Sequence, residues 1–236
     1  MVWIRPANVP YPSVWHTFKA KDIDSDRLVN YVVQDLPEER FTDAVNHMLG
    51  IFIYDEPMCR AKKLAEDPAS VESIRVLWQE MVKQRLVLVC FREGSDEIVG
   101  VNMTYAASKD DSKDYTPTAK LWRDVYDAVD YFYKHSQDSV LFDTVLSALG
   151  LSVSPKYRGR GIATEILRAR VPLCRAVGLK QTTTIFTAPA SQVAAAKVGF
   201  KETLVMRYEE LAQLDPRFHF PGTENTYCKS MSLMID

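Results

Sequence analysis

Glycine and arginine alternate in a short stretch of this chain, residues 157–161 with the sequence Tyr-Arg-Gly-Arg-Gly. The stretch follows an apolar run that ends at Val153 and precedes a segment with helical spacing. Glycines let a backbone approach a ligand closely, and the free N–H groups of a first helical turn point at an anion. The P-loop and dinucleotide-binding fingerprints are both absent. The stretch therefore predicts an anion site at a strand–helix corner.

A second stretch with chemical potential is Asp55-Glu56-Pro57. It follows apolar residues at helical spacing between Phe41 and Phe52. A proline disfavours the helical conformation of the residue before it, so Glu56 is predicted to lie at a bend. Two interpretations stay open, a solvated acidic turn and a carboxylate at the edge of a cleft.

Composition excludes several classes of function. The chain has 236 residues, 47% of them hydrophobic, and this length and composition suit one α/β domain. The formal charge of −2 gives no indication of a basic surface for nucleic acid. Its four cysteines and four histidines are scattered, so no metal site is predicted. No signal peptide and no membrane-spanning apolar run is found, so we expect a cytoplasmic protein without a membrane partner.

The elements that must position these residues follow from hydrophobic periodicity and turn signals. Residues 1–26 are proline-rich and predict an extended arm packed on a single domain of residues 27–236. The α/β pattern predicts a mixed, mostly antiparallel sheet flanked by helices. We expect strands over 27–36, 86–92, 98–105, 144–153, 181–187, 200–208 and 227–234, and helices from 37, over 71–82, from the Thr116-Pro117 start signal, from about 162 to 176, and over 189–197.

Two further interpretations concern polar and aromatic side chains. The connection over 109–115 reads as a solvated loop. The aromatic cluster Tyr126, Tyr131, Phe132 and Tyr133 suits either core packing or the wall of an aromatic-amine pocket.

The pattern Arg158-x-x-Gly161-x-Ala163 resembles the pyrophosphate-binding signature of the GNAT acyltransferases, and the order of elements resembles their fold. The motifs Asp-Glu-Pro at 55–57 and Leu-Ser-Val at 151–153 are similar to those of the insect-type arylalkylamine N-acetyltransferases, the group that includes the dopamine N-acetyltransferases. Hydroxyls at Thr187 and Ser191 and the ending Lys-Val-Gly-Phe at 197–200 extend the likeness over most of the chain from residue 27. Thr187 stands where serine is familiar.

The resemblance implies acetyl-CoA as cosubstrate and a GNAT fold whose fourth and fifth strands are parallel and separate to admit it. No metal is implied. The residues that the resemblance places at acetyl-CoA are Leu151, Ser152, Val153, Arg158, Gly159, Arg160, Gly161, Ile162, Ala163 and Thr164.

The implied reaction is the acetylation of a small arylalkylamine or related biogenic amine by direct attack in a ternary complex. The amine must lose a proton, and the resemblance implies Glu56 as the general base. Ser191 would protonate the leaving thiolate, and Thr187 would position it. Both hydroxyls have a structural alternative, Ser191 as a helix cap and Thr187 as a strand end.

Asp55, Pro57 and His219 are candidate substrate contacts, although the position of His219 favours a simple loop residue. Cys59 has no visible activating neighbour and is not expected to carry the acyl group. Two alternative functions stay open. The first is acylation of a polyamine or agmatine-like amine, or use of a longer acyl-CoA. The second is acyl-CoA binding without turnover. We expect a monomer.

Overall fold

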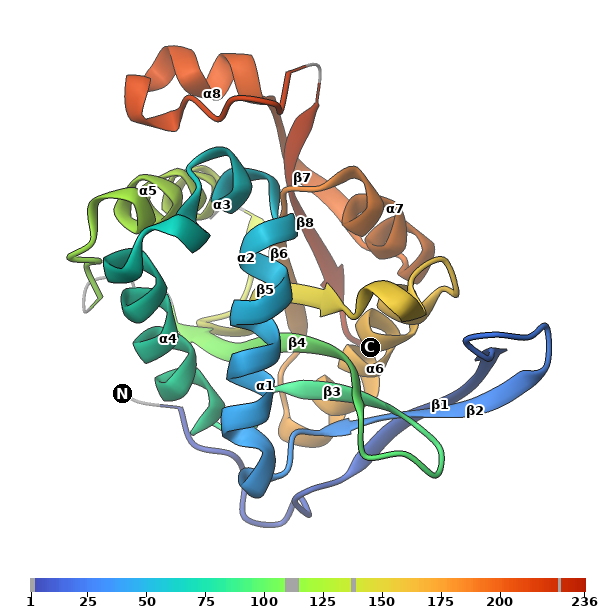
Figure 1. Cartoon of the computed structure of the whole chain (residues 1–236). Coiled ribbons are helices and arrows are strands. Elements are labelled where there is room, and N and C mark those ends of the chain that lie inside the picture. The colour runs from blue at the N-terminus through green and yellow to red at the C-terminus, as the bar shows by residue number, and fades with distance from the viewer. Residues whose placement is uncertain (1–2, 109–114, 137–138, 225) are drawn as a thin grey trace.

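The computed structural model describes residues 3–108, 115–136, 139–224 and 226–236. Its centre is one eight-stranded sheet in the order β1-β2-β3-β4-β5-β6-β8-β7 (Figure 1). Neighbouring strands are antiparallel except β5 and β6, which are parallel. The predicted mixed, mostly antiparallel sheet is therefore confirmed. The strands are β1 Val14–Lys21, β2 Leu28–Asp35, β3 Leu88–Arg92, β4 Ile98–Ser108, β5 Thr144–Val153, β6 Gln181–Phe186, β7 Lys201–Arg207 and β8 Tyr227–Met234.

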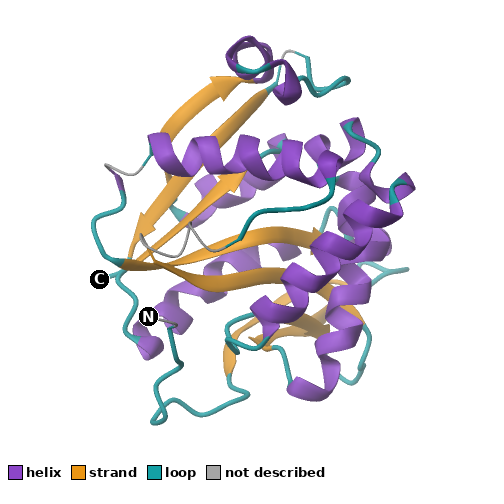
Figure 2. Cartoon of the chain, turned by 90° about the vertical axis from the view of Figure 1, so that its left-hand side faces the viewer, coloured by secondary structure: helices purple, strands orange, loops and turns teal. Residues whose placement is uncertain are grey.

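Helices cover both faces of this sheet (Figures 1 and 2). Alternate residues of β3 show the division, because Val89 packs with the helices of one face and Leu88 with α6 on the other. One core contains α1, α4 and α5, and the second contains α6. The helices are α1 Phe41–His47, α2 Ile53–Asp55, α3 Pro57–Ala61, α4 Pro68–Val82, α5 Lys120–His135, α6 Ile162–Val177, α7 Pro189–Val198 and α8 Tyr208–Leu214, with a π-helical turn at Met48–Phe52.

The N-terminal segment contributes more than the extended arm that we expected over residues 1–26. Residues 14–21 form the edge strand β1, which pairs antiparallel with β2. Asp35 at the end of β2 is fully buried and accepts hydrogen bonds from Arg5 at 2.8 Å and from the Trp15 indole at 2.7 Å. The sheet therefore begins before residue 27.

Several predicted boundaries need correction. The Thr116-Pro117 signal does not start a helix, because α5 begins at Lys120 with Ala119 as N-cap. The helices α3 and α8 were not predicted, since each is short and lacks a hydrophobic repeat. Of the polar connection expected over 109–115, residues 109–114 lie outside the described residues.

A β-bulge bends the strand β5 before its end. Leu151 pairs with Asn102 while Ala148 pairs with Thr104, so two residues of β5 face one residue of β4. Gly150 in this bulge has a φ of +117°, and its carbonyl accepts a 2.7 Å hydrogen bond from the Asn102 amide. Beyond the bulge, the last three residues of β5 still pair with β4.

We expect Gly150→Ala to destabilise the protein more than Gly94→Ala. Both glycines have a positive φ, but a Cβ at Gly150 would lie 2.5 Å from the buried Met48 methyl, whereas nothing lies within 4 Å at Gly94. Backbone strain alone costs about 1 kcal/mol at Gly94. Strain with overpacking costs about 2–4 kcal/mol at Gly150. Urea unfolding of both variants measures the difference, and equal losses would contradict this account of the bulge.

Candidate active site

The parallel strands β5 and β6 touch at one end and then separate. Their only residue pair is Leu146 with Thr182, although both strands continue well beyond it. A cleft of about 480 Å³ opens above this point. It is lined by the ends of β5 and β6, the loop before α6, the first turns of α7, and residues of α2 to α5. The separation implied by the family resemblance is therefore present.

The glycine-rich corner forms one end of the cleft. Gly159 and Gly161 have left-handed φ values of +76° and +79°, and Gly161 is the N-cap of α6. No side chain of the described residues forms a cap hydrogen bond at the start of this helix. The N–H groups of its first turn are therefore available to an anion in the cleft, which Ile162, Ala163 and Thr164 also line.

Two features of the β5 side suit an extended ligand with amide groups. Leu151, Ser152 and Val153 pair with β4 along one edge, and the other edge faces the cleft. The Ser152 hydroxyl oxygen is buried without a hydrogen-bond partner in the described part of the chain. Buried polar atoms of this kind are rare, so a ligand that pairs along β5 fits the edge.

The two arginines of the motif do different things. Arg158 lines the cleft, donates to the Val153 carbonyl at 3.0 Å and forms an ion pair with Asp55 across it. Arg160 does not line the cleft. Its guanidinium donates to backbone carbonyls of the loop and of the β1–β2 turn, including Ile23 at 2.7 Å. The Arg160 guanidinium thus holds the corner in shape, and the contact of Arg160 with the cofactor stays a prediction.

Glu56 lies at the predicted bend. Its φ and ψ of −64° and 128° are extended, and it is the N-cap of α3 with Pro57 as the first helical residue. The carboxylate accepts hydrogen bonds from the Met58 N–H at 3.1 Å and from the Cys59 N–H at 2.7 Å. Two backbone donors hold the carboxylate in one orientation at the edge of the cleft.

The surroundings of Glu56 include a residue that sequence reasoning missed. Tyr208 is buried, and its hydroxyl donates to the Thr187 carbonyl at 2.9 Å. Burial, with the nearby Glu56 carboxylate, raises the pKa of Tyr208 well above its usual range. Burial and the nearby Glu56 also raise the pKa of the Cys59 thiol far above its ordinary value, which agrees with the prediction that Cys59 is not an acyl carrier.

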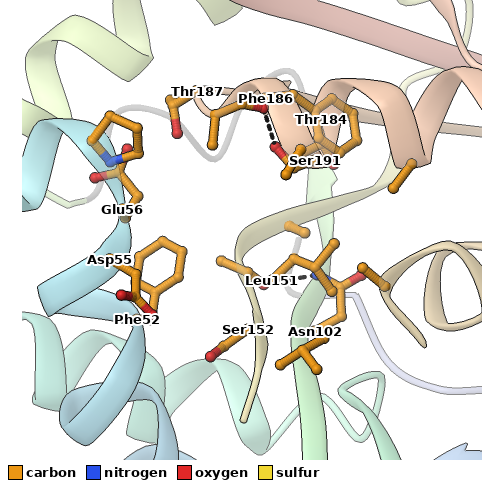
Figure 3. A pocket seen from close by; sticks show the side chains of 18 of the residues that line it. Phe52, Asp55, Glu56, Asn102, Leu151, Ser152, Thr184, Phe186, Thr187 and Ser191 are labelled. Atoms are coloured by element: carbon orange, nitrogen blue, oxygen red, sulfur yellow. Dashed lines mark hydrogen bonds between the residues drawn. The ribbon is translucent and has the colours of Figure 1, made fainter. Parts of the chain in front are cut away.

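The structure brings most of the other candidates together. Glu56 and Asp55 lie on one side of the opening, Leu151 and Asn102 on the opposite side, and Thr187 and Ser191 at its top (Figure 3). The Ser191 hydroxyl donates to the Ala188 carbonyl at 2.8 Å, as expected of a first-turn residue, while the residue also lines the cleft.

The two remaining candidate substrate contacts differ in their position relative to the cleft. Pro57 lines the cleft, but His219 does not. His219 is exposed in the segment after α8, so the simpler interpretation as a loop residue is the one that the geometry supports.

An apolar pocket extends the cleft away from the glycine-rich corner. Its walls come from the π-helical turn and from α3, α4 and α5, through Phe52, Met58, Ile74, Trp122, Val125 and Val129. The aromatic cluster of α5 that we considered for this role lies elsewhere, since Phe132 is in the core and Tyr133 bonds to Ser147. The side of α5 that faces the cleft is instead the one that carries Trp122, Val125 and Val129.

Comparison with known proteins agrees with this arrangement. The sequence model of the acetyltransferase (GNAT) family matches residues 64–200. The chain belongs to the GNAT acetyltransferases. A solved structure named "insect putative arylalkylamine N-Acetyltransferase 7", from the yellow fever mosquito Aedes aegypti, is 52% identical to this GNAT protein, with 99% of this chain and 100% of that chain covered and a TM-score of 0.97. The predicted GNAT fold and family are confirmed, and the protein is an enzyme of the acetyltransferase type.

Two more distant structures resemble this GNAT enzyme in their fold only. Arylalkylamine N-acetyltransferase 2 from Aedes aegypti is 17% identical with a TM-score of 0.71, over 87% of this chain and 99% of that chain. A polyamine N-acetyltransferase from Drosophila melanogaster is 15% identical with a TM-score of 0.69, over 87% and 100%. A search of curated proteins gives no match. Because enzymes named for different amines share this fold, the fold does not select the amine.

GNAT enzymes use acetyl-CoA, and the uncapped α6 corner with the free edge of β5 fits such a ligand. Within the described residues, no group of three or more His, Cys, Asp or Glu side chains could hold a metal ion. No helix in the described ranges is long and apolar enough to span a bilayer.

We expect Glu56→Ala to lower the free energy of unfolding by about 1 kcal/mol, because it removes the side-chain cap of α3. The matched control is Asp55→Ala, whose half-exposed ion pair contributes about 0–1 kcal/mol. Thermal unfolding at neutral pH compares the two. A larger loss from Asp55→Ala than from Glu56→Ala would mean that the cap does not hold α3. Catalytic tests of Glu56 should therefore use Glu56→Gln, which keeps a carbonyl acceptor.

Proposed function

We propose that this enzyme transfers the acetyl group of acetyl-CoA to the primary amine of a small arylalkylamine. The observation that carries the proposal is the position of Glu56, a carboxylate fixed between the glycine-rich corner and the apolar pocket of one cleft. The identity of 52% to a mosquito protein named as an arylalkylamine N-acetyltransferase supports the same class of amine.

The lining of the pocket favours an aromatic amine over a polyamine. Phe52 and Trp122 are aromatic lining residues, and the neighbouring lining residues on α4 and α5 are aliphatic. Among the described lining residues the carboxylates are Asp55 and Glu56, and Asp55 is paired with Arg158. A polyamine needs a second free carboxylate for its distant ammonium group, so it remains the second candidate.

The proposed reaction is direct attack in a ternary complex. Glu56 takes the proton of the amine through water, and the nitrogen lone pair attacks the thioester carbonyl carbon. Backbone N–H groups on the free edge of β5, at Leu151 to Val153, stabilise the negative charge on the carbonyl oxygen. The C–S bond then breaks, and Ser191 gives a proton to the sulfur while Thr187 positions the thiol. The Ser191 hydroxyl regains a proton through water from the nitrogen of the new C–N bond.

We also propose a cytoplasmic monomer without nucleic-acid or membrane partners. The four cysteines are buried free thiols, as a reducing compartment would keep them. The formal charge of −2 is unsuited to a polyanionic partner.

The test is thiol release from acetyl-CoA against tyramine, dopamine, serotonin, tryptamine, agmatine and spermidine. We expect turnover with the arylalkylamines and a loss of about 10²-fold or more in kcat for Glu56→Gln at neutral pH, because the base is removed. Asp43→Asn is the control and should keep its kcat, because Asp43 pairs with Arg40 and does not line the cleft. Turnover confined to agmatine and spermidine would favour the second candidate. Binding of acetyl-CoA without turnover on any amine would favour a binding protein.

We expect Asp55→Asn to tighten acetyl-CoA binding several-fold at low salt. The change removes the carboxylate that pairs with Arg158 at the corner where the pyrophosphate is proposed to lie. A half-exposed pair of this kind is worth about 0–1 kcal/mol, which sets the size of the effect. Calorimetric titration at two salt concentrations measures it, with Arg158→Met expected to weaken binding. Unchanged affinity in both variants would place the pyrophosphate away from Arg158.

A further inference from the structure

Arg170 lies at the point where β5 and β6 separate. It is in the middle of α6, and none of its surface is exposed. Its Nη1 donates to the Thr184 hydroxyl at 2.8 Å and to the Thr182 hydroxyl at 3.2 Å. Thr182 is the β6 residue that still pairs with β5, and its hydroxyl donates to the Leu146 carbonyl at 2.8 Å. The guanidinium therefore spans from the closed end of the two strands to the open part.

Within the described residues this buried cation has only neutral partners: three hydrogen-bond acceptors and the Phe200 ring, whose centroid lies 5.8 Å from the Arg170 Cζ. Its Nε donates to the Asn102 side-chain oxygen at 2.8 Å, and its Nη2 is buried without a partner in the described part of the chain. None of the ion pairs formed by the described residues includes Arg170. A buried charge without a counter-ion is costly, so its presence calls for a compensating interaction.

The charge persists at neutral pH and is not cancelled by its neighbours. Burial lowers the pKa of Arg170 to about 10, which still leaves it protonated. The titratable groups that interact with it are Cys174 on α6 and Tyr133 on α5. Burial raises the pKa of Cys174 to about 12 and that of Tyr133 well above its usual range, so both are neutral.

The cation lies one side chain beneath the cleft. Two of its three hydrogen-bond partners, Asn102 and Thr184, line the cleft on opposite sides of the separation (Figure 3). Asn102 in turn donates to the Gly150 carbonyl at 2.7 Å and so holds the bulge of β5. Arg170 thus connects both walls of the cleft and adds a positive charge below its floor.

We infer that Arg170 is a positioning residue that holds the two walls apart and stabilises, through its charge, the thiolate of CoA when it leaves. The inference rests on the proposed function. In that step the amine nitrogen forms the C–N bond, the C–S bond breaks, and the electron pair remains on sulfur. The ammonium proton goes to Glu56 before the attack. The sulfur then takes a proton from Ser191, whose hydroxyl regains a proton through water from the nitrogen of the new C–N bond. A positive charge near a thiol favours the thiolate and so lowers the pKa of the thiol. The effect is larger where water is excluded.

The experiment measures the pKa of the CoA thiol when CoA is bound to the full chain, from the ultraviolet absorbance of the thiolate across a pH series. We expect the bound thiol of the wild type to titrate about one pH unit or more below free CoA. Arg170→Met should raise that pKa by about one pH unit, and Arg170→Lys should keep most of the lowering. Arg168→Met is the matched control, since Arg168 lies on the same helix, half exposed, and pairs with Glu165.

Steady-state kinetics gives a second readout. If the thiolate is stabilised by the charge, Arg170→Met lowers kcat about tenfold and changes the KM for acetyl-CoA far less, whereas a merely structural defect would raise KM as well. Arg170→Lys should recover most of the kcat.

Two results would overturn the inference. One is a wild-type complex whose thiol titrates like free CoA, which decides the question even if Arg170→Met does not fold. The other is an Arg170→Met protein that binds CoA with a thiol pKa equal to that of the wild type. Failure of the wild type to bind CoA would overturn the proposed function itself, and the inference with it, so the two failures are distinguishable.

Discussion

The separation of β5 from β6 is the constraint on which the rest of this structure depends. Two parallel strands in the middle of a sheet would ordinarily satisfy each other's backbone groups, and buried groups left unpaired cost free energy. Here the pairing stops after Leu146 and Thr182. The strand β5 carries a bulge at Gly150, and Asn102 and Thr184 bind a shared guanidinium on either side of the gap. The sheet thus carries an edge that a ligand with amide groups can complete.

The position of Glu56 follows from a similar local break. Pro57 is the first residue of α3, and it forces the preceding Glu56 into an extended conformation that ends α2. The same break in the helix frees the N–H groups of Met58 and Cys59, and the Glu56 carboxylate accepts a hydrogen bond from each. A residue that reads as a turn in the sequence is therefore a fixed carboxylate in the structure, because the new helix supplies the donors that hold it.

Local patterns predicted the fold better than they predicted the walls of the site. The strands β5 and β8 have the predicted bounds, since β5 is a mainly apolar run and β8 alternates Ser with Met and Leu over residues 230–233. The edge strand β1 was read as part of an arm, because its exposure alternates weakly and its pairing with β2 is a tertiary feature. The sequence left open whether the aromatic cluster of α5 packs in the core or lines a pocket, since periodicity gives the faces of a helix but not which of them meets a cleft; the structure places Phe132 in the core.

Charge in this site is distributed differently from what the motif suggests. The two arginines of the motif have other partners. Arg158 pairs with Asp55, and this pair is half exposed and screened by water, while Arg160 donates to backbone carbonyls. Arg170 belongs to no motif and sits within the apolar stripe of α6, yet it is the cation that water cannot screen. A guanidinium buried among neutral oxygens is stable only if the surrounding polar groups are held in place, and the separated strands hold them. The open sheet and the buried charge therefore require each other.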